Sequence, residues 1–202
     1  MHDLEQKSGW VFDLDGTLTE AIHDFDFIRA MLGVPAGSGI LEWLDTLPEA
    51  ERAPLERRLD KHEYALAGRA IAATGAHDIL AALTRAECRL GIVTRNNLRN
   101  VELTLRTAGL TEFFAPESIM TRENARPKPQ PDGILRLMSG WNSSPQRCVM
   151  VGNHHHDLAA GRAAGVTTVL VDTTAVFRWP EVTDLGVTSL VELRARALPK
   201  QH

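Results

Sequence analysis

The chain has 202 residues, of which 44% are hydrophobic and 24% charged, and its formal net charge is −4. This length suits one core domain with at most a small accessory domain. The weakly acidic balance, with no basic block, argues against nucleic acid as the main partner, and no apolar run reaches the roughly 18 residues of a membrane span. The polar start, 1–7, has no signal-peptide core, so we expect a cytoplasmic protein whose Cys88 and Cys148 are free thiols.

The first predicted element is a strand over 9–14 (GWVFDL), a short apolar run that ends in carboxylates. The stretch that follows, 20–74, has no strand-like run but has helical patterns over 25–32, 40–47 and 48–73. We interpret it as a small helical cap domain, with 1–19 and 75–202 forming the core domain. The apolar residues expected to pack inside the cap are Phe27, Met31, Leu44, Leu55, Leu59, Leu66 and Ile71.

Beyond residue 74, helical patterns alternate with apolar runs that predict buried strands. The helices are expected over 76–87, 97–108, 131–140 and 156–164, and the strands over 89–94, 147–152 and 166–171. Asn96 is a suitable N-cap and Pro131 suits a first helical turn. Val187 and a helix over 189–197, capped by Ser189, are expected to complete the sheet edge. The alternation predicts an α/β fold: a Rossmann-like parallel sheet flanked by helices, with the cap inserted after the first strand.

Paired carboxylates follow the first predicted strand. Asp13 and Asp15 stand two residues apart, so their side chains point to the same side, and Gly16 allows a sharp turn after them. Two close carboxylates repel each other unless a cation or proton offsets their charge. The carboxyl end of a parallel strand is also where open α/β sheets bind ligands.

Two further segments carry groups suited to a phosphoryl ligand. Thr94 ends a predicted strand just before a helix, where its hydroxyl and nearby backbone N–H groups can bind a phosphoryl oxygen. Lys128 lies among three prolines in the segment RPKPQP, and prolines stiffen an extended backbone. Only four of the 22 basic residues are lysines, which suggests that a compact charge is needed here to neutralise phosphate.

The fourth segment, Gly152-Asn153-His154-His155-His156-Asp157, follows another apolar strand. Three adjacent histidines on a turn cannot easily face one ion, so we expect loop packing or substrate contact rather than a transition-metal site. Asp157 is the acid of this segment, whereas Asn153 offers only a neutral carbonyl oxygen to a hard cation.

In order and residue type, these four segments resemble the motifs of the haloacid dehalogenase (HAD) superfamily, in the branch of phosphoglycolate phosphatases, β-phosphoglucomutases and phosphonatases with helical caps. The resemblance implies that Asp13 is the nucleophile and Asp15 the general acid and base, with Thr94 and Lys128 completing the catalytic set. It implies that Mg²⁺ is bound by Asp13, Asp15, Asn153 and Asp157. The departure is Asn153, where the family has an acid, and we expect it to weaken Mg²⁺ binding.

We therefore predict a Mg²⁺-dependent phosphatase that hydrolyses a small soluble phosphate monoester through an aspartyl-phosphate, acting as a monomer or homodimer. Gly16, Thr17, Arg95 and Asn96 are expected to contact the substrate. A phosphomutase is an alternative with the same intermediate. A phosphonatase would need a cap lysine, for which Lys61 is the candidate. An alternative of another class is a non-catalytic ligand-binding module whose metal site is weakened at Asn153.

The cap is also expected to supply specificity residues when it closes over the site. The sequence alone does not rank the cap residues that are able to contact a ligand. The candidates are His23, Asp24, Asp26, Arg29, Trp43, Lys61, His62 and Tyr64.

Overall fold

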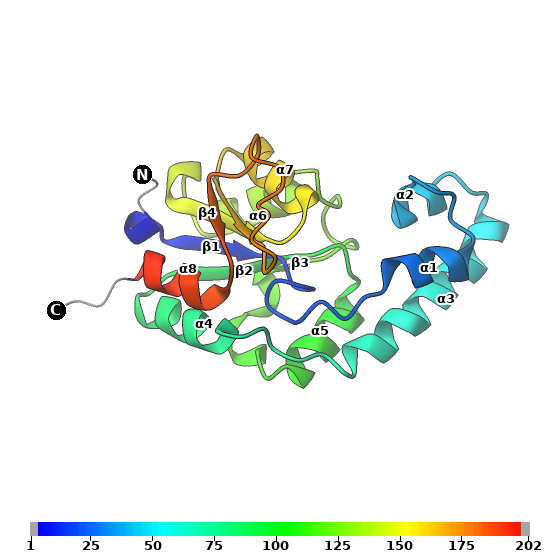
Figure 1. Ribbon diagram of the computed structural model, residues 1–202, viewed down its shortest axis with the longest axis horizontal. Coiled ribbons are helices and arrows are strands. Elements are labelled where there is room, and N and C mark those ends of the chain that lie inside the picture. Colours follow the sequence, from blue (N-terminus) through cyan, green and yellow to red (C-terminus); the bar gives the residue numbers. More distant parts are fainter. Residues whose placement is uncertain (1–3, 199–202) are drawn as a thin grey trace.

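A computed structural model of the chain describes residues 4–198 and shows one parallel sheet covered by helices on both faces (Figure 1). The sheet has six strands in the order β3-β2-β1-β4-β5-β6, and every pairing in it is parallel. The strands are β1 Gly9–Phe12, β2 Arg89–Val93, β3 Ile119–Met120, β4 Cys148–Gly152, β5 Thr167–Val171 and β6 Leu185–Val187. This arrangement confirms the predicted α/β class.

The helices form two layers, one on each face of the sheet. Figure 1 shows α6 and α7 above the sheet and α4, α5 and α8 below it. These helices are α4 Ala76–Arg85, α5 Leu98–Thr107, α6 Asp132–Gly140, α7 His155–Ala164 and α8 Leu190–Ala197. Short 3-10 turns occur at Leu4–Gln6, Thr111–Phe113, Pro116–Ser118 and Pro145–Arg147. Within residues 4–198, no helix combines the length and apolar character needed to cross a membrane.

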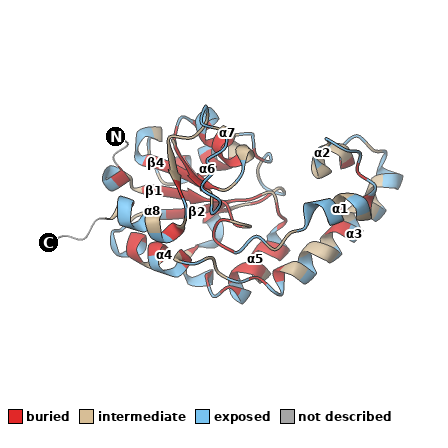
Figure 2. Cartoon of the chain, viewed as in Figure 1, coloured by how far each residue is buried: buried red, intermediate tan, exposed pale blue. Residues whose placement is uncertain are grey.

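Side chains of β1 alternate between two hydrophobic cores because successive residues of a strand point to opposite faces. Trp10 and Phe12 pack in the core that α4, α5 and α8 share with the sheet. Val11 packs in the other core, beneath α6 and α7. Figure 2 shows the resulting concentration of buried residues along the strands. This double coverage explains why the strand sequences are continuously apolar.

The predicted elements of the core are confirmed, with differences at their ends. The strands and helices expected around the site are present, and Ser189 caps α8 by accepting a hydrogen bond from the Glu192 amide. The N-cap of α5 is Asn97 rather than Asn96, and Pro131 stands just before α6 rather than in its first turn. The two-residue β3 was missed because it is too short to show any periodicity.

Three helices between β1 and α4 lie to one side of the sheet, on the right of Figure 1. We call residues 20–74 the helical insert. It contains α1 Phe25–Leu32, α2 Ile40–Leu44 and α3 Glu49–Ala67. A separate hydrophobic cluster that includes Ile28, Leu32, Leu44 and Leu59 holds these helices together.

Two expected core residues of the insert are on its surface. Phe27 is 52% exposed and Ile71 is 57% exposed. Phe27 is next to the buried Ile28 in α1 but points about 100° away from it around the helix axis, and Ile71 follows the end of α3, which stops at Ala67 rather than continuing to 73. Both predictions were wrong because an apolar residue type does not by itself determine which way a short helix faces. The remaining expected residues are buried or half-buried.

Cys88 and Cys148 are free thiols, as expected. Cys148 is buried in β4, whereas Cys88 is half-buried just before β2. Burial raises the pKa of each thiol above its usual range. Raised pKa values keep both sulfurs protonated and poorly nucleophilic, which fits a structural role in packing.

Gly161 marks the closest approach of α7 to the sheet, because a Cβ there would lie 2.7 Å from Thr168 Cγ2 and 3.0 Å from Met150 Cβ. Gly161→Ala should therefore destabilise the protein by about 1–2 kcal/mol, the strain exceeding the gain in helix propensity. Gly140→Ala is the matched control, because nothing lies within 4 Å of its Cβ position at the end of α6; it should be neutral or stabilising by up to about 1 kcal/mol. Urea unfolding measures both, and a Gly161→Ala protein as stable as wild type would contradict the packing described.

Candidate functional site

The chemistry-bearing side chains converge where adjacent strands end. β1, β2 and β4 are neighbours in the sheet, and their carboxyl ends lead to Asp13, Thr94 and Asn153 respectively. The loop between β3 and α6 brings Lys128 to the same place. All four residues line one cavity of roughly 270 Å³, together with Asp15 and Asp157. The sequence prediction that four distant segments form one site agrees with this placement.

Lys128 occupies the centre of the site, between two carboxylates. Its Nζ lies 2.5 Å from Asp13 Oδ1 and 2.6 Å from Asp157 Oδ1. Lys128 and Asp157 are each 2% exposed and Asp13 is 8% exposed. Three charged groups this deeply buried are tolerated only because they are paired with one another.

Asp157 has both carboxylate oxygens engaged. Oδ1 pairs with Lys128, while Oδ2 accepts hydrogen bonds from the backbone amides of Asn153, at 3.1 Å, and His154, at 2.9 Å. His154 is the N-cap of α7, and Asp157 at the third helical position completes a capping box. Asp157 therefore ties the lysine, the end of β4 and the start of α7 into one rigid unit.

The buried charges shift one another's protonation. Burial, followed by the negative charge of Asp157, raises the pKa of Asp13 to about 7, and the nearby Lys128 only partly opposes this. Burial alone would lower the pKa of Lys128, but the carboxylates of Asp13 and Asp157 outweigh it and raise that pKa. One lysine thus serves two buried carboxylates, and a further cation beside Asp13 would favour its ionised form.

A second chain of polar contacts runs through Asn96. Its backbone amide donates to Thr94 Oγ1 at 3.1 Å, and its side-chain amide donates to Asp15 Oδ2 at 3.4 Å. Asn96 itself is buried and lines the cavity. Asn96, which was expected to cap a helix, instead connects the ends of β1 and β2 through these hydrogen bonds.

Asn153 lies against the turn that follows β1. Its Oδ1 accepts a hydrogen bond from the Thr17 hydroxyl at 3.3 Å. Gly16 has a left-handed φ of +81°, and a Cβ there would lie 2.4 Å from Asn153 Nδ2, so only glycine fits this turn. Gly16 and Thr17 do not appear among the described residues that line the cavity; both pack against Asn153 instead.

The helical insert reaches the cavity through Glu42. Arg95 Nη2 donates to Glu42 Oε1 at 2.6 Å, and Arg95 Nη1 contacts His156 Nδ1 at 2.7 Å. Burial and the charge of Arg95 lower the pKa of His156 to about 4, so its imidazole is neutral and can accept this hydrogen bond. Arg95 therefore links α2 of the insert to α7 of the core across the cavity.

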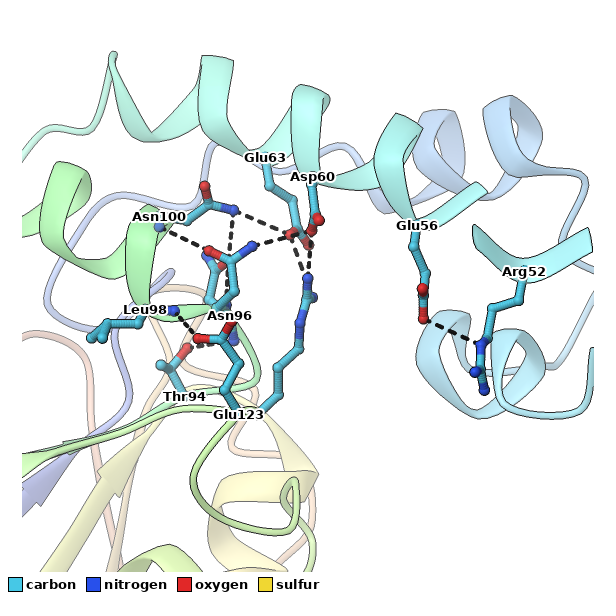
Figure 3. A network of polar contacts seen from close by, with 11 residues as sticks. Arg52, Glu56, Asp60, Glu63, Thr94, Asn96, Leu98, Asn100 and Glu123 are labelled. Atoms are coloured by element: carbon cyan, nitrogen blue, oxygen red, sulfur yellow. Dashed lines mark hydrogen bonds and ion pairs between the residues drawn. The ribbon is translucent and has the colours of Figure 1, made fainter. Parts of the chain in front are cut away.

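A polar network joins α3 of the insert to α5 of the core. Figure 3 shows Asp60 and Glu63 pointing from α3 toward Asn96 and Asn100. Arg122 pairs with Asp60 at 2.5 Å and with Glu63 at 3.5 Å. The Asn100 side-chain amide donates both to Glu63 and to Asn96 Oδ1. The contacts that reach Thr94 and Asp15 thus continue into the insert.

The comparisons with known proteins agree with this geometry. Residues 9–165 match the family described as haloacid dehalogenase-like hydrolase. The chain belongs to the haloacid dehalogenase-like hydrolase family. This HAD protein is 33% identical over 200 residues to the uncharacterized hydrolase YOR131C of Saccharomyces cerevisiae, covering 96% of this chain and 92% of that protein.

Solved structures of HAD proteins share the fold. A HAD family hydrolase from Deinococcus radiodurans, with bound phosphate and sodium, superposes with a TM-score of 0.67 at 27% identity and covers 95% of both chains. A putative phosphoglycolate phosphatase from Lactobacillus plantarum superposes with a TM-score of 0.72 at 18% identity, covering 94% of this chain and 99% of that one. The family match thus shows a HAD-like hydrolase, and the solved structures show that it has the same fold as these proteins.

The structure also shows where some of the insert residues predicted to contact the substrate lie. His23 and Arg29 line the cavity, whereas Lys61 is exposed and is not among the described lining residues. This removes the lysine on which the phosphonatase alternative rested. Phe25, Glu42 and Glu63 line the cavity but were not singled out in the sequence. No local pattern marks them, because they come from three separate helices.

Glu63 makes the link between insert and core sensitive to pH. Burial, partly opposed by Arg122, raises the pKa of Glu63 from 4.5 to about 7. Because the folded state holds this proton more tightly, the stability that Glu63 contributes is present below about pH 4.5 and is lost as the pH rises through about 7.

Glu63→Gln should therefore gain stability relative to wild type as the pH rises from about 4.5 to 7, by on the order of 2 kcal/mol. Urea unfolding at a series of pH values measures this difference. Glu56→Gln is the control, because Glu56 lies on the same helix but is 46% exposed and, among residues 4–198, has its ion pair with Arg52 alone. A difference between Glu63→Gln and wild type that does not change with pH would contradict the assignment.

Proposed function

We propose that this HAD-like hydrolase is a Mg²⁺-dependent phosphatase that hydrolyses a small phosphate monoester through an aspartyl-phosphate on Asp13. The observation that carries the proposal is the buried contact of Lys128 with Asp13 and Asp157, in the cavity that also holds Asp15 and Thr94. Lys128 engages Asp13 Oδ1, and no described residue donates a hydrogen bond to Oδ2. Oδ2 is therefore the oxygen that attacks.

The reaction proceeds in two displacements. Asp13 forms a bond to phosphorus while the bond to the leaving oxygen breaks, and Asp15 gives its proton to that oxygen. Water then attacks phosphorus and loses a proton to Asp15, which restores the Asp13 carboxylate and releases inorganic phosphate. Lys128 and the Thr94 hydroxyl stabilise the phosphoryl oxygens through both steps.

The donor atoms present suit a hard cation such as Mg²⁺, which prefers oxygen ligands. Among residues 4–198, no group of three or more His, Cys, Asp or Glu side chains is arranged to hold a metal. The proposed set is mixed: the carboxylates of Asp13 and Asp15 with the amide oxygen of Asn153, which Thr17 orients. When bound, Mg²⁺ would neutralise charge on the phosphoryl group. Since both Asp157 oxygens are engaged, its proposed role is to position Lys128 and the turn at Asn153.

We further propose that the helical insert, residues 20–74, is a cap domain on a core formed by 1–19 and 75–202. Three features support this division: the insert has its own hydrophobic cluster, contributes lining residues to the cavity, and meets the core through polar contacts of Glu42, Asp60 and Glu63. Polar contacts separate at lower cost than an apolar interface, which suits a cap that opens and closes.

Purified protein should release phosphate from small phosphate esters when Mg²⁺ is present and not when it is chelated. Asp13→Asn should lower the rate more than about 1,000-fold, because no nucleophile remains. Circular dichroism of the variant checks that it is folded. Equal rates in wild type and Asp13→Asn would exclude the proposed mechanism. Appearance of a second phosphate ester without free phosphate would favour the phosphomutase alternative.

Asn153→Asp should tighten Mg²⁺ binding by about tenfold, because it adds a negative charge while keeping an acceptor for Thr17. Calorimetric titration of the protein with Mg²⁺ measures this directly, without relying on turnover. Asn153→Ala is the control and should bind more weakly than wild type. An unchanged or lower affinity in Asn153→Asp would contradict the placement of Mg²⁺ at residue 153.

A further inference from the structure

The cavity has two chemically different halves. The half formed by the core holds the charged and polar groups described above. The half formed by the helical insert contains an apolar wall made by Phe25, Ile40, Leu41 and Leu59, beside the polar residues His23, Arg29, Glu42 and Glu63. If the core residues hold the phosphoryl group as proposed, the leaving group of the substrate lies in the insert half, against this apolar wall.

Phe25 gives this half a flat wall. It is the first residue of α1 and is 55% exposed, which leaves a large apolar ring uncovered at the cavity. Its ring stacks with that of His23, at a centroid distance of 5.8 Å and an interplanar angle of 16°. Exposed aromatic surface inside a cavity favours a planar apolar ligand group.

Phe27 provides a natural comparison two residues along the same helix. It is 52% exposed, nearly as much as Phe25. Its ring contacts His62 of α3, at a centroid distance of 5.4 Å, and it is not among the described lining residues of the cavity. The two phenylalanines therefore differ in position relative to the site rather than in exposure.

The charges around the cavity disfavour a second anionic group on the substrate. Among the described lining residues, every lysine and arginine has a carboxylate partner: Lys128 has Asp13 and Asp157, Arg95 has Glu42, and Arg29 has Asp26. Glu42 and Glu63 also line the cavity. A carboxylate or second phosphate on the leaving group would compete with these pairs and would approach the Glu42 carboxylate.

Resting on the proposed function, we infer that the preferred substrate is a phosphate monoester of an uncharged alcohol that carries a planar apolar ring, rather than an ester with a second anionic group. The ring packs on Phe25 and against Ile40, Leu41 and Leu59, while the phosphoryl group lies at Asp13 and Lys128. A volume of roughly 270 Å³ is at the low end for small-molecule pockets and suits a single ring plus the phosphoryl group.

Three phosphate esters of primary alcohols test this inference: benzyl phosphate, ethyl phosphate and phosphoglycolate. Their leaving groups are an aromatic, a small apolar and an anionic alcohol, so the reacting bond is similar in each. Phosphate release with Mg²⁺ present should give a kcat/KM for benzyl phosphate at least about tenfold above that for phosphoglycolate.

Phe25→Ala should lower kcat/KM for benzyl phosphate by about tenfold and change that for ethyl phosphate by less than about twofold. Phe27→Ala, the matched control, should leave both values within about twofold of wild type. Equal effects of Phe25→Ala on both esters, or none, would overturn the inference. A preference for phosphoglycolate that is lost in Arg29→Ala would overturn it as well, because Arg29 would then be the site for an anionic group.

Binding separates a failure of this inference from a failure of the proposed function. Calorimetry with the Asp13→Asn protein measures the affinities of benzyl phosphate and phosphoglycolate without turnover. If wild type releases no phosphate from any ester, the proposed function is wrong. The inference about the ligand still stands if benzyl phosphate binds at least about tenfold more tightly, and it fails if phosphoglycolate binds equally well or neither ester binds.

Discussion

The burial of Lys128 between Asp13 and Asp157 is the constraint on which the rest of the site depends. The lysine is 2% exposed, and losing it would leave two buried carboxylates close together without a cation between them. The three residues come from the end of β1, the loop before α6 and the first turn of α7. The ion pairs of Lys128 therefore fix the relative positions of these three segments. Asp157 also accepts hydrogen bonds from the backbone amides of Asn153 and His154, which fixes the turn after β4 as well.

A second set of contacts connects this charged centre to the helical insert. Asn96 and Asn100 carry the connection from Thr94 and Asp15 to Glu63, and Arg95 reaches Glu42. Both routes consist of polar side chains, whereas each lobe is held together internally by apolar packing. This difference in packing is consistent with the proposed division of labour, in which the core would hold the phosphoryl group and the insert would contact the rest of the substrate.

The elements that sequence patterns predicted well are those whose environment is uniform along their length. The continuously apolar β1, β2, β4 and β5 are covered on both faces, so their composition alone indicates burial in a parallel sheet. The two-residue β3 offers no such pattern. Phe27 and Ile71 were placed wrongly because surface exposure of an apolar residue carries no signal in the sequence. Asn96 and Asn97 can both cap a helix by residue type, and only the backbone geometry selects Asn97.

The sequence by itself determined the sheet class and the four segments that carry the chemistry, because both depend on local features: apolar runs, a strand-end carboxylate pair, a lysine among prolines and an acid four residues after Asn153. Tertiary structure alone decided how these groups pair. It placed Lys128 between two particular carboxylates, paired the two oxygens of Asp157 with Lys128 and with backbone amides, and brought Phe25, Glu42 and Glu63 to the cavity from three helices. Such pairings depend on distances between residues far apart in the chain, and no local pattern encodes those distances.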